Sequence, residues 1–573
     1  MIRATIQNLI RDALLTYGVE PEVVVLERPA DLAHGDYSTN GALAYSKILK
    51  ISPRELAEKL VAEISQNLPP EIKKLEIAGP GFINFFLSDK AIQDENVKEK
   101  SISATKYSGR KILVEHSSPN LFKPFHIGHL MNNITGEFVT RATTIGGGAV
   151  TTMSFPSDVS LGIAKAVYIL VEDKKEGKDV FILSDEEKIE AFGEAYRRGV
   201  AYFDQHPEEL SKAKEIAHII YDTENSSDTR ATFERAKEFN VAYLVRTIKD
   251  LGSVINELIY ESEAGVRGQE IVLANTGEGK VFTKSEGAIV YIPDEARKDL
   301  HTQVFINSEG HPTYEAKDLG LIDLKFAKFV PDLSYFITDA EQIPHFKVVF
   351  DAASKLGGVW TERVEKSTHV PHGRMLFKGQ KMSSRLGGVP LALEVVAAVE
   401  EEVRQKAGEK IAHFGAEERA RLEREIALSA LRIAVLRSKP GININFDPDS
   451  SLSFEGDSGP YLLYTHARCA SLLEKGGHQG VIPAFQNKGA TDLERTLALS
   501  EMIFTEAVED LTPQKITTYL FEIAQLFNGL YANTQFLSDD KELSGHYLAI
   551  VKRMKNVLAE GLWVLGITAP DRM

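Results

Sequence analysis

The sequence of 573 residues has a single cysteine, Cys469. One cysteine cannot form an internal disulfide or a cysteine-cluster metal site, which excludes a secreted disulfide scaffold and a zinc ribbon. No apolar run approaches the roughly 18 residues that a membrane span requires. The first residues place Ile2, Ile6 and Leu9 on one helical stripe, unlike the core of a signal peptide. We therefore expect a cytoplasmic protein that does not associate with membranes.

A basic excess is also lacking. The chain has 66 Lys and Arg residues against 82 Asp and Glu residues, a formal net charge of −16. This balance argues against non-specific coating of DNA, in which a basic face supplies most of the affinity. It leaves open a local basic surface for another nucleic acid. At roughly 100–200 residues per domain, the length predicts three to five domains.

Apolar and polar runs divide the chain into four segments. We predict an α+β domain over 1–105, a domain with a doubly wound parallel sheet over 106–390, a connecting helical segment over 391–455 and a helical domain over 456–573. An insertion is expected at about 160–300. The strands predicted for the sheet domain, which alternate with helices, are Lys111–Glu115, Gln303–Ile306, Ser334–Thr338 and Arg374–Phe377.

Sequence signals for individual helices and strands are clearest in the predicted domain 1–105. Ser52 followed by Pro53 and Glu55 predicts a helix start, with Ser as N-cap and Pro at the first helical position. The apolar run 82–87 predicts a strand. The polar stretch 89–106 is interpreted as a linker.

The first candidate site is His126-Ile127-Gly128-His129, which follows the strand 111–115 and stands at a predicted helix N-terminus. Ligands of open parallel sheets bind beyond the carboxyl ends of the strands, and helix N-termini favour phosphate. Two imidazoles there can donate hydrogen bonds to phosphate oxygens, and Gly128 allows a flat base close to the backbone. The alternative is a chance string whose histidines only cap the helix.

The second candidate site is Lys381-Met382-Ser383-Ser384-Arg385, followed by Gly387-Gly388. Cations and hydroxyls on a glycine-flanked loop can close over a polyphosphate and neutralise charge on a leaving group. The alternative is a solvated basic turn.

Taken together, the two strings resemble the paired signatures of class I aminoacyl-tRNA synthetases. The run 115–120 and Lys123-Pro124-Phe125 before His126 resemble the arginyl form of this site. Further matches to the arginyl enzymes lie along nearly the whole chain, at Gly35–Asn40, Gly79–Asn84, Pro312–Asp318, Gln342 with His345-Phe346, and Tyr464–Arg468.

The resemblance implies a Rossmann-like catalytic domain, an N-terminal tRNA-binding domain and a helical anticodon-binding domain. It implies an arginine–tRNA ligase that uses ATP, L-arginine and tRNA(Arg), with Mg²⁺ arriving on ATP and no dedicated protein metal site. We expect a monomer that does not bind DNA.

Residue roles follow from the same resemblance. The catalytic residues are His126, His129, Lys381 and Lys123. The residues implied in ATP binding are His126, Gly128, His129, Lys381, Met382, Ser383, Ser384 and Arg385. The residues implied in arginine binding are Glu115, Asn120, Tyr314, Asp318 and Gln342. The residues implied in tRNA binding are Asn40, Tyr464 and Arg468.

Two of these groups also have a physical rationale. Tyr314 and Asp318 are four residues apart and share a helical face, so Asp318 could pair a guanidinium beside the Tyr314 hydroxyl. Tyr461, Tyr464 and Arg468 share another face, on which aromatic rings could stack unpaired bases. The alternatives are an exposed helix face for the first group and a packed amphipathic helix for the second.

The chain departs from the family pattern in several places. Ser384 stands where the standard second signature has a lysine, and Lys123 matches the lysine proposed to substitute for it in arginyl enzymes. Leu386 replaces a residue that is basic in many relatives. The segment 157–162 keeps little of a family motif beyond Asp158.

Two rival interpretations remain. A cysteinyl enzyme would be expected to hold zinc largely through cysteines, which one cysteine argues against. A non-catalytic tRNA-binding protein on the same scaffold would lack ATP binding, so an ATP titration separates it from an enzyme.

Overall fold

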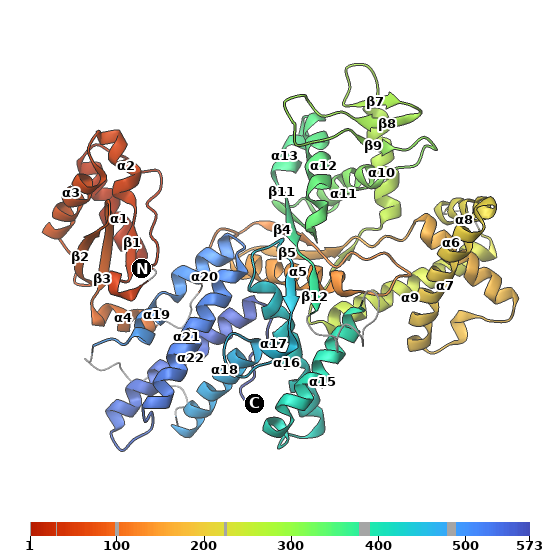
Figure 1. Ribbon diagram of the computed structural model, residues 1–573. Coiled ribbons are helices and arrows are strands. Elements are labelled where there is room, and N and C mark those ends of the chain that lie inside the picture. The colour runs from red at the N-terminus through yellow and green to blue at the C-terminus, as the bar shows by residue number, and fades with distance from the viewer. Residues whose placement is uncertain are drawn as a thin grey trace.

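The computed structural model in Figure 1 describes residues 2–29, 31–97, 102, 104–222, 226–377, 390–477 and 489–573, without the side chains of 407–410. An α+β unit at the N-terminus, a central sheet with its covering helices, and a helical C-terminal part follow one another along the chain.

The N-terminal unit packs its helices on a three-stranded antiparallel sheet in the order β1-β3-β2. Ser52 accepts a hydrogen bond from the Glu55 N–H at 3.1 Å and Pro53 is the first helical residue, which confirms the predicted helix start. The predicted strand 82–87 is also confirmed. The elements of this unit are α1 (Ile2–Thr16), β1 (Tyr37–Thr39), α2 (Gly41–Leu49), α3 (Pro53–Gln66), β2 (Ile72–Ala78) and β3 (Phe82–Leu87).

The linker predicted from residue 89 is wrong at its start, because residues 89–96 form α4 (Asp89–Asn96). Ser88 caps this helix by accepting a hydrogen bond from the Ala91 N–H, and Ala91 and Ile92 are buried. A cap and two buried apolar residues stabilise a short helix even where the composition is polar.

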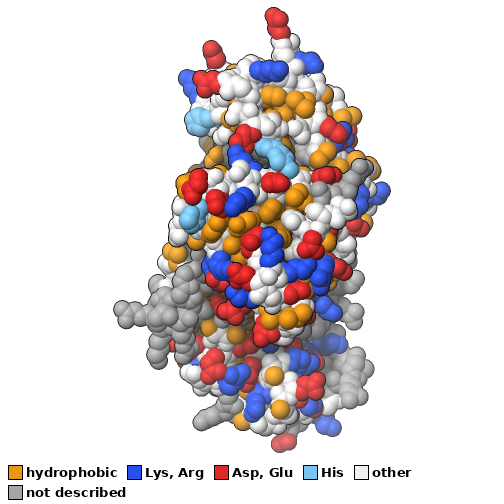
Figure 2. Space-filling model, turned by 90° about the vertical axis from the view of Figure 1, so that its right-hand side faces the viewer, with side chains coloured by type: hydrophobic (Ala, Val, Ile, Leu, Met, Phe, Trp, Pro, Cys, Tyr) orange, Lys and Arg blue, Asp and Glu red, His pale blue; other side chains and the backbone are white. Residues whose placement is uncertain are grey.

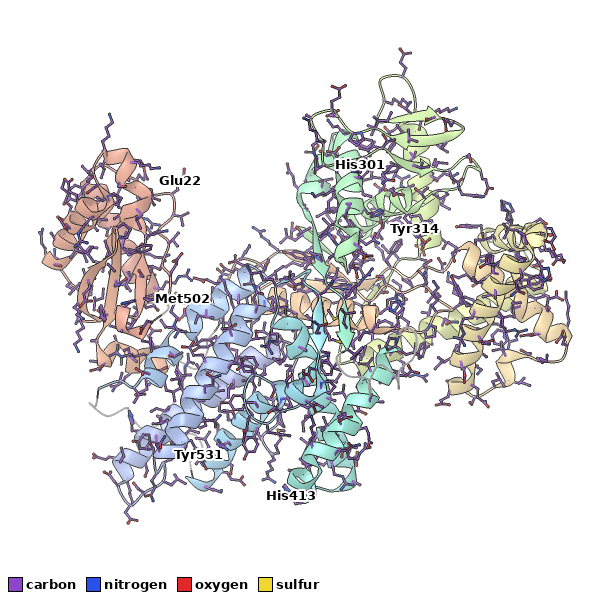
Figure 3. All side chains as sticks on the ribbon, viewed as in Figure 1. Glu22, His301, Tyr314, His413, Met502 and Tyr531 are labelled. Carbon is purple, nitrogen blue, oxygen red and sulfur yellow. The ribbon has the colours of Figure 1, made fainter. Side chains whose placement is uncertain are left out.

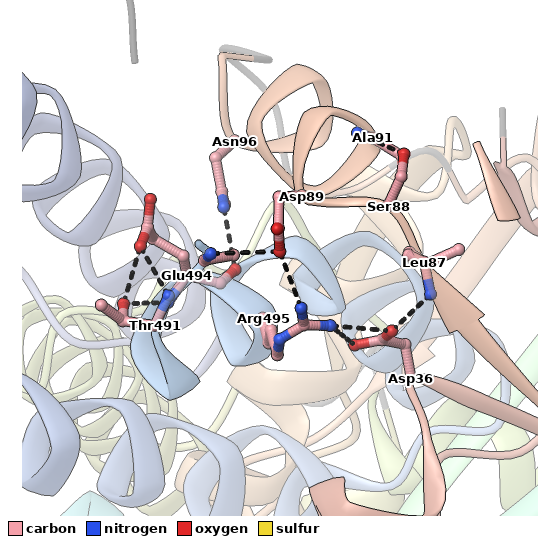
Figure 4. Close-up of polar contacts among 10 residues, drawn as sticks. Asp36, Leu87, Ser88, Asp89, Ala91, Asn96, Thr491, Glu494 and Arg495 are labelled. Carbon is pink, nitrogen blue, oxygen red and sulfur yellow. Dashed lines mark hydrogen bonds and ion pairs between the residues drawn. The ribbon is translucent and has the colours of Figure 1, made fainter. Parts of the chain in front are cut away.

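Figure 4 shows how α4 and its neighbours meet the C-terminal part. The Arg495 guanidinium lies 3.2 Å from Asp36 and 2.9 Å from Asp89. Asn96 donates to the Glu494 carbonyl oxygen at 2.8 Å. Around these bonds, Ala498, Leu499 and Met502 pack into the core of the N-terminal unit. Polar and apolar contacts therefore hold that unit against α19 (Asp492–Ala498) and α20 (Ser500–Glu509).

The central sheet has five parallel strands in the order β11-β10-β4-β5-β6. Ile112, Leu113 and Val114 of β4 are almost fully buried, as expected for a strand covered on both faces. The chain proceeds from β4 to β5 on one side and later adds β10 on the other side. The strand order therefore reverses between β4 and β10, where open sheets bind their ligands. The five strands are β4 (Lys111–Glu115), β5 (Ala149–Ser154), β6 (Glu257–Leu258), β10 (Leu333–Asp339) and β11 (Ser367–His372).

Two predicted strands exist but do not belong to this sheet. β9 (Gln303–Ile306) pairs with β8 (Ala288–Tyr291), which pairs in turn with β7 (Phe282–Ser285) in an antiparallel sheet. β12 (Met375–Phe377) pairs with β13 (Ile444–Phe446). A short apolar run indicates a strand but carries no information about its partner.

Helices cover the sheet and form most of the rest of the molecule (Figure 1). In its described residues, the predicted insertion 160–300 contains the five α-helices α6 to α10 and the strands β6, β7 and β8, of which β6 pairs with β5. Helices α6 to α9 are α6 (Leu161–Lys175), α7 (Asp185–Gln205), α8 (Leu210–Tyr221) and α9 (Asp228–Asp250). Those nearer the site are α5 (Ile127–Ile145), α10 (Glu261–Ala274), α11 (Tyr314–Phe329), α12 (Ile343–Lys355) and α13 (Val359–Glu365). The remaining helices after the sheet are α15 (Ala392–Ile411), α16 (Ala416–Leu436), α17 (Pro448–Ser451), α18 (Gly459–Lys475), α21 (Pro513–Asn533) and α22 (Lys541–Val564).

On the face drawn in Figure 2, the described Lys and Arg side chains are interspersed with Asp and Glu rather than separated by sign. Within the described ranges, every helix is too short or too polar to cross a bilayer.

Candidate active site

The first candidate site, His126-Ile127-Gly128-His129, lies at the N-terminus of α5, and its two histidines cap the helix. The His126 Nδ1 accepts a hydrogen bond from the Gly128 N–H at 3.1 Å, and the His129 Nδ1 accepts one from the His126 N–H at 3.1 Å. The two rings stack with their centroids 3.7 Å apart. Because each Nδ1 is an acceptor, each neutral ring carries its proton on Nε2, where it can be donated. The histidines therefore cap the helix and keep a donor for a ligand.

Both imidazoles are neutral at neutral pH. Burial lowers the pKa of His126, and the charge of Lys123 lowers it further. Burial also holds the pKa of His129 well below its ordinary value, with smaller contributions from His126, His372 and Lys123. These rings can thus offer N–H donors to an anion but not a full positive charge. Lys123 itself is exposed, and its Nζ lies 4.7 Å from the centre of the Tyr196 ring.

The chain returns to this helix end at Pro390. The Ile127 N–H donates to the Pro390 carbonyl oxygen at 2.9 Å, and the Ala392 N–H donates to the Phe125 carbonyl oxygen at 2.8 Å. The second candidate string comes shortly before Pro390 in the sequence. Its residues Lys381, Met382, Ser383, Ser384 and Arg385 lie outside the described residues.

A second polar group joins α11 and α12. The Asp318 Oδ2 and the His345 Nε2 are 2.5 Å apart, and the His345 Nδ1 lies 3.6 Å from Glu315. Burial alone would lower the pKa of His345, but hydrogen bonds to Asp318 and Glu315 outweigh burial and raise it to about 10. His345 is therefore a cation between two carboxylates at neutral pH. From the sequence, His345 is part of a motif, and no role is predicted for it.

Glu115, at the carboxyl end of β4, is buried in an ion pair with Lys325 of α11. Lys325 is completely buried, and its Nζ lies 3.3 Å from the centre of the Phe336 ring. Burial raises the pKa of Glu115 and lowers that of Lys325, while their attraction opposes both shifts. Sequence reasoning missed Lys325. The signal available in the sequence was a lysine directly between two apolar residues, Leu324 and Phe326.

Replacing Lys325 with methionine leaves the Glu115 carboxylate buried without a partner. Breaking a buried pair in this way costs about 3–5 kcal/mol, so we expect the free energy of unfolding to fall by that amount. Urea denaturation measures it. As a matched control, Lys328→Met on the same helix removes an exposed pair with Glu257 and a contact with the Phe329 ring, and should cost less than about 1 kcal/mol. Equal losses in the two variants would contradict the assigned role of Lys325.

Contacts along β11 connect the histidines at the α5 N-terminus with the Asp318–His345 pair. The Thr338 Oγ1 of β10 lies 2.7 Å from the His369 Nε2, and the His369 ring stacks on Phe346 with centroids 4.6 Å apart. Phe346 follows His345 on α12, while His372, at the end of β11, acts electrostatically on His129. The helix end at His126 and the carboxylate of Asp318 thus lie along the carboxyl edge of one sheet.

The other residues predicted for arginine binding border the same edge. Asn120 follows β4 and pairs with Ser157 as an isolated β-bridge. Gln342 follows β10 and is exposed. Tyr314, the first residue of α11, is 63% exposed and lies near the junction between the sheet and the β7–β9 unit (Figure 3). Their roles stay predictions.

The residues predicted for tRNA binding lie far from this edge. On α18, the Arg468 guanidinium lies 4.8 Å from the Tyr464 ring and 4.6 Å from the Tyr531 ring. These side chains line a cavity of about 400 Å³ together with His413. Figure 3 shows Tyr531 and His413 toward the end of the helical part that is remote from Tyr314. Tyr461 is instead buried, where its hydroxyl accepts a hydrogen bond from Asn528.

Comparisons with known proteins decide the family. The family model described as "tRNA synthetases class I (R), catalytic domain" matches residues 91–447. The chain belongs to the class I arginyl-tRNA synthetases. Two further models, "Arginyl tRNA synthetase N terminal domain" and "DALR anticodon binding domain", match residues 2–87 and 462–573 of this synthetase. The boundaries predicted at 105, 390 and 455 stay predictions.

Similar proteins support the assignment over the full length. The synthetase is 28% identical to an arginine–tRNA ligase of Alteromonas mediterranea, with 100% of both chains covered. It is 30% identical to one of Fusobacterium nucleatum, covering 94% of this chain and 93% of that one. The solved structure of Thermus thermophilus arginyl-tRNA synthetase matches with a TM-score of 0.83 at 25% identity, again over 100% of both chains. The predicted Rossmann-like fold with flanking N-terminal and helical domains is thereby confirmed.

The segment 157–162, where the synthetase departs from the family pattern, has a structural role. Asp158 is 1% exposed and accepts hydrogen bonds from the Ser262 N–H and hydroxyl and from Lys237. Ser160 caps α6 by accepting a hydrogen bond from the Ile163 N–H. The segment thus ties α6, α9 and α10 together.

Proposed function

We propose that the synthetase joins L-arginine to tRNA(Arg) at the carboxyl edge of its parallel sheet. In the first step the arginine carboxylate attacks the α-phosphorus of ATP, which forms arginyl-adenylate and releases pyrophosphate. In the second step a hydroxyl of the terminal ribose of the tRNA attacks the arginyl carbonyl carbon, and AMP leaves. One observation carries the proposal: the imidazole-capped helix end and the Asp318 carboxylate border the same strand ends.

The phosphates of ATP are assigned to the N-terminus of α5. There His126 and His129 donate from Nε2, and Gly128 leaves room for the base. Because both imidazoles are neutral, positive charge for the departing pyrophosphate must come from other side chains. We assign this role to Lys381 and Lys123, and assign further ATP contacts to Met382, Ser383, Ser384 and Arg385. The protein thus orients the reactants and stabilises charge without a protein nucleophile.

Arginine is assigned to the other half of the edge. The Asp318 carboxylate pairs the guanidinium, and the Tyr314 hydroxyl bonds beside it. Asn120 and Gln342 follow neighbouring strands and are assigned to the α-amino and carboxylate end, with Glu115 nearby.

The proposal also covers the metal ion, the location in the cell and the oligomeric state. No trio of His, Cys, Asp and Glu side chains within the described ranges forms a metal site. We propose that Mg²⁺ arrives on ATP and keeps water and phosphate ligands. We propose that the synthetase works in the cytoplasm as a monomer and does not bind DNA or membranes.

The tRNA is assigned to two remote surfaces. Tyr464 and Arg468 present stacked aromatic and cationic groups at the cavity of the helical part, a combination that binds unpaired bases. Asn40, half-buried at the start of α2, is assigned to the tRNA contact of the N-terminal unit.

Aminoacylation of tRNA(Arg) with labelled arginine tests the proposal. We expect attachment that requires ATP and is not supported by lysine or cysteine. As the family resemblance implies, arginine-dependent pyrophosphate exchange should be negligible until tRNA(Arg) is added. Exchange of equal rate without tRNA would contradict the expected coupling. ATP binding without any aminoacylation would contradict the proposed activity.

A further inference from the structure

His345 lies between two acidic side chains of a different helix. The His345 ring, on α12, hydrogen-bonds Asp318 through Nε2 and faces Glu315 through Nδ1, both on α11. The exposed fractions of the three side chains are only 14%, 16% and 17% in the order His345, Asp318, Glu315. An ionic contact this sheltered from water is screened far less than a surface pair.

The groups that face His345 set the charge of this cluster. Asp318 and Glu315 come from α11, and His369 comes from β11. Burial lowers the pKa of His369 to about 4, with smaller contributions from His372 and His345, so this ring is neutral at neutral pH. One imidazolium against two carboxylates leaves a net charge of −1. That is the charge that complements a single guanidinium.

The hydrogen bond between His345 and Asp318 also fixes the orientation of the Asp318 carboxylate. Asp318 uses Oδ2 for His345, which orients the group and leaves Oδ1 for a ligand. A side chain held in its binding geometry before the ligand arrives loses less entropy on binding. Without His345, the Asp318 and Glu315 carboxylates would repel each other with no cation between them.

We propose that His345 is a positioning residue for arginine: it orients the Asp318 carboxylate and limits the cluster to one unit of negative charge. The inference rests on the proposed function, in which Asp318 binds the arginine guanidinium. It adds a residue that touches neither arginine nor ATP and acts through Asp318 alone.

Steady-state aminoacylation by the full-length His345→Ala and His345→Gln variants tests the inference. Loss of one charge-assisted hydrogen bond should raise the KM for arginine about 10–100-fold in His345→Ala. The KM for ATP and kcat should change less than about threefold, because His345 lies on the arginine side only. The Gln amide can still donate to Asp318, so His345→Gln should show a clearly smaller rise.

A matched control lies two residues along the same helix. Lys347→Gln removes an exposed cation that faces Asp299 at 3.6 Å, and it should leave every constant unchanged. Thermal unfolding of each variant reports whether it is folded. If His345→Ala does not fold, the KM for arginine of His345→Gln is compared with that of Lys347→Gln, and a rise only in His345→Gln supports the role of His345.

The outcomes separate the inference from the proposed function. An unchanged KM for arginine in a folded His345 variant, or an equal rise in the KM for ATP, would overturn the role of His345. A wild-type protein that attaches no arginine to tRNA(Arg) would instead overturn the proposed function.

Discussion

Asp318→Ala is expected to weaken arginine binding by roughly 2–5 kcal/mol, the usual cost of truncating one member of a buried, hydrogen-bonded charge pair. The guanidinium loses its counter-charge, and the His345 imidazolium is left without its closest partner. The KM for arginine in aminoacylation measures the loss. The KM for ATP should change little, because the ATP phosphates are assigned to the other half of the site.

Asp323→Ala provides the control for Asp318. Asp323 is an acid of the same helix whose carboxylate pairs with Arg267 and Arg363. Its removal should lower thermal stability and leave the KM for arginine unchanged. If Asp318→Ala also affected only stability, Asp318 would be a structural residue and the assigned arginine pocket would be wrong.

Lys381→Ala is expected to lower the rate of adenylate formation by about 10²–10³, the usual effect of removing one preorganised contact to developing charge. The physical reason lies in the described part of the site. The histidines at the α5 N-terminus are neutral, so they cannot neutralise the departing pyrophosphate. Pyrophosphate exchange in the presence of tRNA(Arg) measures the rate.

The neighbouring lysine Lys378 offers the comparison for this prediction. Lys378→Ala removes a cation of the same segment that lies before the signature string, and it should leave the exchange rate within about threefold of wild type. Equal exchange rates for Lys381→Ala and wild type would remove Lys381 from the mechanism.

Much of the local structure could be predicted because it depends on neighbouring residues. Ser52 and Pro53 start a helix by capping, and the apolar run of β4 forms a buried strand. The histidine string stands at a helix N-terminus as expected. The motifs that resemble arginyl enzymes indicated the family because several of them occur in order along the chain.

What could not be predicted depends on contacts between distant residues. Gln303–Ile306 is a strand, but its pairing with β8 is decided by packing. Lys325 meets Glu115 from a position 210 residues away in the sequence. The polar composition of 89–96 suggested a linker, yet contacts with α19 bury part of α4. Sequence spacing alone also gave His345 no role, because its two carboxylates lie on another helix.

A crystal structure with a non-hydrolysable arginyl-adenylate analogue and tRNA(Arg) tests the central claim most directly. We predict that the guanidinium lies on the Asp318 Oδ1 with His345 still bound to Oδ2, and that the phosphate lies within hydrogen-bond distance of the Nε2 atoms of His126 and His129. An analogue bound with its guanidinium remote from Asp318, or with its phosphate away from the α5 N-terminus, would contradict the account.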